Sequence, residues 1–294
     1  MSEKMAENKI IKKRKKNSPM SDVWRKLKKN KLAMISLFII CLLIIISIFA
    51  PLLVPYDYTE QDYDNMLQAP NSRYIFGTDN FGRDVFSRVI YGSRYTVFIG
   101  FVCITVAAII GVLLGLIAAY YPKLDNLIMR TIDIIIGMPA MTLLMCLIAV
   151  MGVSLTNMII ALCITTIPGF ARVTRAQVLV VKNQEFIEAA IAIGADTKRI
   201  LFRHILPNSL APIIVQYTLG AGTVVLLSAS LSFIGMGVQA PNPEWGLMIS
   251  SGRPYLRSNW YLSIIPGFAI ILLTFTLNYL GDGLRDALDP KLNK

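Results

Sequence analysis

The sequence predicts an all-helical integral membrane protein that crosses the bilayer six times. Of its 294 residues, 55% are hydrophobic and only 16% are charged, whereas a soluble domain carries about 25% charged residues. The charged residues are also clustered, which leaves long uncharged runs between them. As helices, these runs are long enough to cross a hydrocarbon core of about 30 Å.

The first four spans follow from three uncharged runs. Leu32 to Val54 contains 23 residues without a charge. This is too long for the apolar region of a signal peptide, which has about 7–15 residues. Tyr95 to Tyr121 is the second run. Ile134 to Ala171 is too long for one helix, and the turn-forming residues at 152–157 divide it into spans three and four.

The last two spans are predicted at about 209–235 and 261–280. Within the second span, the glycines at 111 and 115 have the GxxxG spacing that lets helices approach closely, and we expect them to pack spans of this bundle together. In chain order, the predicted organisation is a basic tail (1–31), a first transmembrane helix (32–54), an extracytoplasmic loop with an amphipathic elbow (55–94), a core transmembrane domain of five helices (95–283) and a short tail (284–294).

The distribution of Lys and Arg predicts that both termini are cytoplasmic, because basic residues are retained on that side of a membrane. With the amino terminus inside, the inner segments hold 23 of the 29 Lys and Arg residues and the outer loops hold six. The basic run at 12–16 could bind nucleic acid, but beside a span we expect it to contact anionic lipid, with no nucleic-acid partner. The inner segments are 1–31, 122–133, 172–208 and 281–294, and the outer loops are 55–94 and 236–260.

The titratable residues predict no catalytic, metal or cofactor site. The four cysteines fall one in each of the first four spans, without a CxxC spacing. His204 is the only histidine, so a His-based triad lacks its partners. The span cores lack the Asp, Glu, His or Arg that ion-coupled transporters place in the bilayer, and the chain has no phosphate-binding loop of the Walker type. Energy for uphill transport would therefore come from another polypeptide.

The longest inner loop predicts a helical hairpin. Asn183 to Ile193 is rich in good helix formers, and Gly194 allows the chain to turn. Asp196 or the threonine after it can cap a second short helix, which Pro207 is expected to end. The apolar triplet at 200–202 would then be exposed at the cytoplasmic end of the bundle, and such a surface requires a protein partner.

This loop resembles the coupling loop of ATP-binding-cassette (ABC) importer permeases, which docks into a cleft of the ATPase subunit. The shared pattern is Glu-Ala-Ala, a glycine four residues after the second alanine, and Leu-Pro about a dozen residues further on. His204 stands where the general pattern has isoleucine, a local change that leaves docking in place. The resemblance implies a coupling loop at about 177–207. Its expected residues are Glu188, Ala189, Ala190, Gly194, Leu206 and Pro207, with Ile200, Leu201 and Phe202 as apolar contacts.

Three further stretches are similar to the C-type subunit of dipeptide, oligopeptide and nickel permeases. The first is Phe76 to Arg88 together with Tyr91 to Arg94. The residues of this stretch also predict a Gly-rich turn before an amphipathic helix at the membrane surface. The others are Leu231 to Gly246 and Asn278 to Pro290. Together the likeness extends from about Met20 to the end of the third stretch, which is almost the whole chain.

The resemblance implies a type I ABC importer permease in the inner or plasma membrane of a bacterium, forming half of a translocation path for peptides. A second, related permease subunit would form the other half, and an extracytoplasmic binding protein would deliver the substrate. Two ATPase subunits would bind ATP and magnesium, so this chain would hold no cofactor and would not be an enzyme. Nickel or a metal chelate is the alternative substrate, because nickel permeases share these motifs. A membrane enzyme or a self-sufficient channel would instead work without partners.

Overall fold

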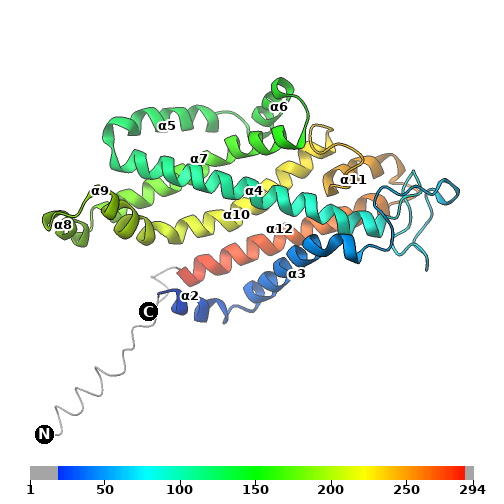
Figure 1. Ribbon diagram of the computed structural model, residues 1–294, viewed down its shortest axis with the longest axis horizontal. Coiled ribbons are helices and arrows are strands. Elements are labelled where there is room, and N and C mark those ends of the chain that lie inside the picture. Colours follow the sequence, from blue (N-terminus) through cyan, green and yellow to red (C-terminus); the bar gives the residue numbers. More distant parts are fainter. Residues whose placement is uncertain (1–18, 289–294) are drawn as a thin grey trace, which may run out of the picture.

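The computed structural model describes residues 19–288, so the basic run at 12–16 and the last residues of the chain lie outside the described part. Five long helices run side by side (Figure 1): α3 (Lys31–Leu53), α4 (Val85–Tyr120), α7 (Leu155–Lys182), α10 (Leu206–Phe233) and α12 (Tyr261–Leu288). Each of these helices is long and apolar enough to cross a membrane. For α10, the candidate span also includes the helical turns that precede it, from Thr197.

The remaining elements are shorter helices and turns, and no strand occurs among the described residues apart from one isolated bridge between Thr78 and Asp84. The predicted all-helical class is therefore confirmed. These elements are α2 (Pro19–Leu27), η1 (Tyr63–Asn65), α5 (Pro122–Ile136), α6 (Ala140–Met151), α8 (Glu185–Ala192), α9 (Thr197–Arg199), η2 (Ile200–Ile205), α11 (Trp245–Gly252) and η3 (Arg253–Tyr255).

The third predicted span is bent rather than straight. α5 begins at Pro122, inside the predicted inner loop, and the chain turns by 94° before α6 begins. Pro139 explains the break, because it cannot donate a helical hydrogen bond and disfavours helical geometry at the residue before it. The bundle therefore has five candidate spans, or six when this bent pair is counted as one. The predicted division after it is confirmed: Gly152 ends α6 with a φ of +86° and Ser154 caps α7.

The amphipathic elbow predicted before the second span is not a separate helix. Residues 85–94 are the first turns of α4, which continues for 36 residues to Tyr120. Val85 and Val89 are buried under other parts of the chain, so the apolar face of this segment packs against protein rather than lying on the membrane surface. Asp84 caps the helix by accepting a hydrogen bond from the N–H of Ser87 (2.8 Å).

Glycines in the second half of α4 bring this helix into close contact with α7. A Cβ built on Gly111 would lie 2.5 Å from the Cβ of Phe170, and one built on Gly115 would lie 2.5 Å from the carbonyl oxygen of Ala171. Real Cβ atoms do not approach other atoms so closely, so only glycine fits at either position. The GxxxG spacing packs two spans of this chain together, as predicted.

The two described ends of the chain lie at the same end of the bundle (Figure 1). Leu27, Ala33 and Ala287 form a small apolar cluster there, which joins α2 to the end of α12. The segment between α7 and α10 lies at this end too, whereas residues 54–84 and 234–260 lie at the other. The side of the membrane that each end faces stays a prediction from the Lys and Arg distribution.

Candidate functional site

The chain turns between α8 and α9 at Gly194. The N–H of Ala195 donates to the carbonyl of Ala190 (3.1 Å) and the N–H of Gly194 donates to that of Ile191 (2.9 Å), which is the Schellman pattern of a helix end. Gly194 has a φ of +78°, a left-handed conformation that residues with a Cβ rarely adopt. A Cβ built on it would meet nothing within 4 Å. Backbone conformation, and not crowding within this chain, therefore favours glycine here.

The prediction that Pro207 ends the second helix of the hairpin is wrong. The helix that begins at Thr197 continues through η2 into α10, so residues 197–233 form one span. Pro207 lacks the N–H that would donate to the carbonyl four residues earlier. Just before it, η2 has a wider π-helical turn, in which the N–H of Leu206 donates to the carbonyl of Leu201. The proline therefore lies in the first turn of α10, where a missing donor is tolerated.

Two of the three predicted apolar contacts face inward. Ile200 is 3% exposed and Leu201 is 8% exposed. The expectation that both are contacts for a partner is wrong, because they anchor the loop to α4, α7 and α8. Phe202 points outward and is 54% exposed. The apolar cluster beneath the loop consists of Leu116, Ala119, Val178, Val181, Ile187, Ile200, Leu201 and Ile205.

The loop exposes five apolar side chains, to which we refer together as the loop face. It consists of Phe186, Ala189, Ile191, Ile193 and Phe202. The first two and Ile193 lie on one side of α8 and its cap, because they are spaced three and four residues apart. Ile193 is 83% exposed. Surfaces of this kind bind other proteins or membranes.

Sequence reasoning missed three members of the loop face, Phe186, Ile191 and Ile193. The helical spacing of the first and third was a usable signal. The other predicted loop residues divide between surface and core: Glu188, Ala189 and Pro207 are exposed, Leu206 is half-buried and Ala190 is buried. The structure brings all of them to one end of the bundle, and their role in docking stays a prediction.

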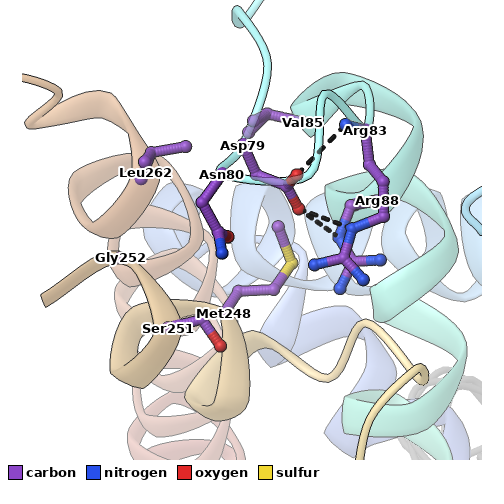
Figure 2. Close-up of a pocket in the computed structure, with 9 residues that line it drawn as sticks. All are labelled: Asp79, Asn80, Arg83, Val85, Arg88, Met248, Ser251, Gly252 and Leu262. Atoms are coloured by element: carbon purple, nitrogen blue, oxygen red, sulfur yellow. Dashed lines mark hydrogen bonds and ion pairs between the residues drawn. The ribbon is translucent and has the colours of Figure 1, made fainter. Parts of the chain in front are cut away.

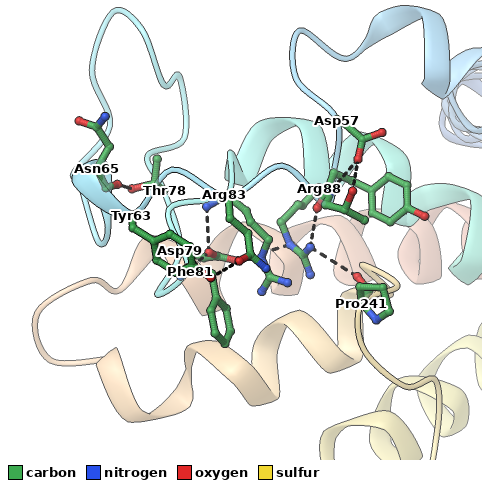
Figure 3. A network of polar contacts seen from close by, with 12 residues as sticks. Asp57, Tyr63, Asn65, Thr78, Asp79, Phe81, Arg83, Arg88 and Pro241 are labelled. Atoms are coloured by element: carbon green, nitrogen blue, oxygen red, sulfur yellow. Dashed lines mark hydrogen bonds and ion pairs between the residues drawn. The ribbon is translucent and has the colours of Figure 1, made fainter.

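At the opposite end, residues 55–84 fold over the start of α4 around the carboxylate of Asp79 (Figures 2 and 3). One carboxylate oxygen accepts from the N–H of Arg83 (3.0 Å), and the other from the Nε of Arg83 (2.7 Å). The Nε of Arg88 lies 3.5 Å from that second oxygen. Arg88 also donates from Nη1 to the carbonyl oxygen of Tyr58 (2.8 Å). This buried group, here called the outer cluster, therefore ties the loop to α4.

The outer cluster continues to α11. The indole Nε1 of Trp245 donates to the carbonyl of Val89 in α4 (2.9 Å), and the ring is 1% exposed. Glu244 caps α11 by accepting from the N–H of Leu247 (2.9 Å). Burial raises the pKa of Glu244 above its ordinary value, since an ionised carboxylate is costly away from water. The cavity beside Asp79 in Figure 2 measures about 20 Å³, which is too small for a peptide.

Asp79→Ala is expected to loosen this end of the molecule, because it leaves two buried guanidinium groups without their carboxylate. Removing one partner of a buried ion pair costs about 3 kcal/mol or more. Thermal unfolding of the detergent-purified protein measures the loss. Asp57→Ala is the control, because Asp57 is exposed and, of the described residues, its side chain bonds only to Thr59. Equal melting temperatures for the two variants would contradict the role of Asp79.

The fold and the two ends define a class of protein: a bundle of helices long and apolar enough to cross a membrane, with an exposed loop face at one end and a closed polar cluster at the other. Residues 111–294 match the family described as "Binding-protein-dependent transport system inner membrane component". Residues 18–70 match "N-terminal TM domain of oligopeptide transport permease C". The chain belongs to this family of ABC importer permeases, which are multi-pass proteins of the bacterial inner membrane.

Relatives of the chain match over almost their whole length. It is 49% identical over 276 residues to the dipeptide transport system permease protein DppC of Alkalihalophilus pseudofirmus, covering 94% of this chain and 91% of the relative. It is 40% identical to the di/tripeptide transport system permease protein DppC of Pseudomonas aeruginosa, covering 94% and 93%. It is 42% identical to the glutathione transport system permease protein GsiD of Escherichia coli, covering 94% and 91%.

A solved structure shares the fold. The permease chain in inward-facing conformations of the MetNI methionine ABC transporter superposes with a TM-score of 0.58 and 21% identity, covering 69% of this chain and 97% of that chain. The predicted type I importer fold is confirmed by this match and by the family.

Proposed function

We propose that this chain forms half of a transmembrane path for short peptides, with a second, related permease subunit forming the other half. The 49% identity to a dipeptide permease over 94% of the chain carries the proposal. The relatives named above serve dipeptides, di- and tripeptides and glutathione, and these names favour a peptide over nickel or a metal chelate.

The loop face is proposed to dock on ATPase subunits. Two observations support this role: apolar side chains are exposed at the end of the bundle, and the Glu-Ala-Ala pattern lies among them. The buried cluster beneath the loop packs it against α4 and α7, so a movement of the docked ATPase would be passed to two spans.

The proposed orientation places both chain ends and the loop face in the cytoplasm, in agreement with the 23 basic residues of the inner segments. The outer cluster would then face the outside, where a binding protein delivers the peptide. The segments proposed for that side are 55–84 and 236–260.

Uptake by proteoliposomes tests the peptide proposal. The vesicles contain this chain, the second permease and the ATPases, and the binding protein is added outside. They are expected to accumulate a labelled dipeptide when ATP is enclosed inside the vesicles, on the side of the ATPases. A non-hydrolysable ATP analogue is the control for energy coupling. Accumulation of nickel with no accumulation of dipeptide would favour the alternative substrate and contradict the proposal.

The purified chain alone is expected to hydrolyse no ATP, because its sequence contains no phosphate-binding loop of the Walker type. Phosphate release is measured for the chain alone and for the chain with its ATPase partners. Only the second sample is expected to show turnover. Turnover by the chain alone, after removal of contaminating ATPases by a second purification, would contradict the assignment of hydrolysis to partners.

A further inference from the structure

A groove of about 480 Å³ runs along the side of the bundle between α7, α10 and the end of α12. Small-molecule sites commonly enclose about 300–1,000 Å³, so the groove has room for a short peptide. Its polar lining comes from Gln177 of α7, Asn208 and Gln216 of α10, and Arg285 of α12. The groove therefore joins three helices that are far apart in the sequence.

The amide groups of the groove have unused hydrogen-bonding capacity. The side chains of Gln177 and Gln216 have no hydrogen-bond partner among the described residues. Asn208 donates from Nδ2 to the carbonyl of His204 (2.6 Å), and its side-chain oxygen accepts no hydrogen bond from any described residue. Pro212 also lines the groove, and because it has no N–H, the backbone carbonyl of Asn208 lacks its usual helical donor.

A glycine lies beside Gln216, the lining residue furthest along α10. A Cβ built on Gly169 of α7 would lie 3.1 Å from the Nε2 of Gln216, so the amide of Gln216 lies across the bare backbone of α7. Gln216 is ten residues beyond the start of α10, which places it about 15 Å along the helix. A polar amide at this depth is costly against lipid. The groove thus extends from the end of the bundle that carries the loop face well into the span.

Elsewhere on α12 the exposed surface is apolar, in contrast to the polar lining of the groove. Ile264, Phe268, Ile271 and Phe275 are exposed and repeat at helical spacing, as expected for a face that contacts lipid. Among the described residues, Arg285 is the only one with a charged side chain that lines the groove, and it forms no ion pair with any of the others.

We propose that this groove holds a peptide in transit, with the amides of Gln216 and Gln177 on its backbone and the guanidinium of Arg285 on its terminal carboxylate. The assignment rests on the proposed function, since it requires that peptides cross beside this chain. Amide side chains pair with the peptide backbone whatever the peptide's own side chains are, which suits a carrier of varied sequences. No acidic residue among those described lines the groove, so the peptide's ammonium group is expected to pair outside that part of it.

The test is the initial rate of dipeptide uptake by proteoliposomes that contain the complete importer and saturating binding protein. Gln216→Leu removes the amide at nearly constant volume and is expected to lower the rate about fivefold, which corresponds to one lost hydrogen bond. Arg285→Gln is expected to lower it about tenfold, because a charge-assisted pair is stronger. Arg285→Lys keeps the charge and is expected to restore most of the rate. Thr223→Val is the control. Thr223 is exposed on α10 outside the groove, and the one hydrogen bond of its hydroxyl to a described residue is to the carbonyl of Leu219.

ATP hydrolysis stimulated by the binding protein is measured in the same vesicles to separate transit from assembly. The proposal predicts that hydrolysis stays at the Thr223→Val level while uptake falls in the two groove variants. Uptake equal to the control in both variants would overturn it, and so would a parallel loss of uptake and hydrolysis, which would indicate a structural role. No dipeptide uptake by the unaltered complex would overturn the proposed function, and the groove assignment with it.

Discussion

Gly115→Leu is expected to remove most of the folded protein from the membrane. Even a Cβ at this position would lie 2.5 Å from the carbonyl of Ala171 and 2.8 Å from the Cβ of Thr174, and leucine adds three more carbons. α4 and α7 would have to separate, and overpacking of a well-packed interface costs about 3 kcal/mol or more when the backbone must move. We expect a large drop in membrane abundance and in the unfolding temperature of the remaining protein.

Gly267→Leu is the matched control for that substitution. Gly267 also lies within a long helix, α12, but a Cβ built on it would have its nearest neighbour, Ile249, at 3.9 Å, an ordinary contact distance. Abundance and unfolding temperature are expected to stay close to those of the unaltered chain. If the two variants behave alike, the close approach of α4 to α7 is not what the glycine at 115 provides.

Phe202→Ala is expected to weaken the binding of ATPase subunits, and so to lower transport, without unfolding the protein. Phe202 is 54% exposed in the isolated chain, and loss of an aromatic anchor from a well-packed interface costs about 2 kcal/mol, or roughly a 30-fold weaker affinity. Copurification of ATPase subunits and dipeptide uptake should both fall, while the unfolding temperature of the chain alone should not.

Leu201→Ala is the matched control, because the neighbouring Leu201 is 8% exposed and belongs to the cluster beneath the loop. Its loss should lower the unfolding temperature, since a buried Leu→Ala change costs about 2–5 kcal/mol. A Phe202→Ala variant that still copurifies its ATPases at the level of the unaltered chain would show that the loop face is not the docking surface.

The sequence predicts well what depends on composition and on local backbone chemistry. The uncharged runs identify the long helices because lipid tolerates few charges over a whole span. Gly194 and the turn at 152–157 could be predicted because a left-handed residue and a capping serine are local requirements. The GxxxG contact could be predicted as well, because close packing of helices needs residues without side chains.

What the sequence did not predict depends on neighbours that are distant in the chain. Burial of Ile200 and Leu201 follows from the position of α4 and α7, which local hydrophobicity does not report. The continuation of the helix past Pro207 depends on the wider turn before it. In the same way, Gln177, Gln216 and Arg285 lie on three different helices, and only the packing of the bundle shows that they line one groove.

Site-specific photocross-linking tests the central claim, the docking of the loop face on the ATPase subunits, most directly. The four native cysteines are replaced, a single cysteine is placed at Ile193 or at Asn242, and each is labelled with a benzophenone maleimide in the assembled importer. The account predicts a cross-link to an ATPase subunit from position 193, where the native side chain is 83% exposed on the loop face. It predicts none from position 242, at the other end of the bundle. A cross-link from position 242 together with none from position 193 would contradict it.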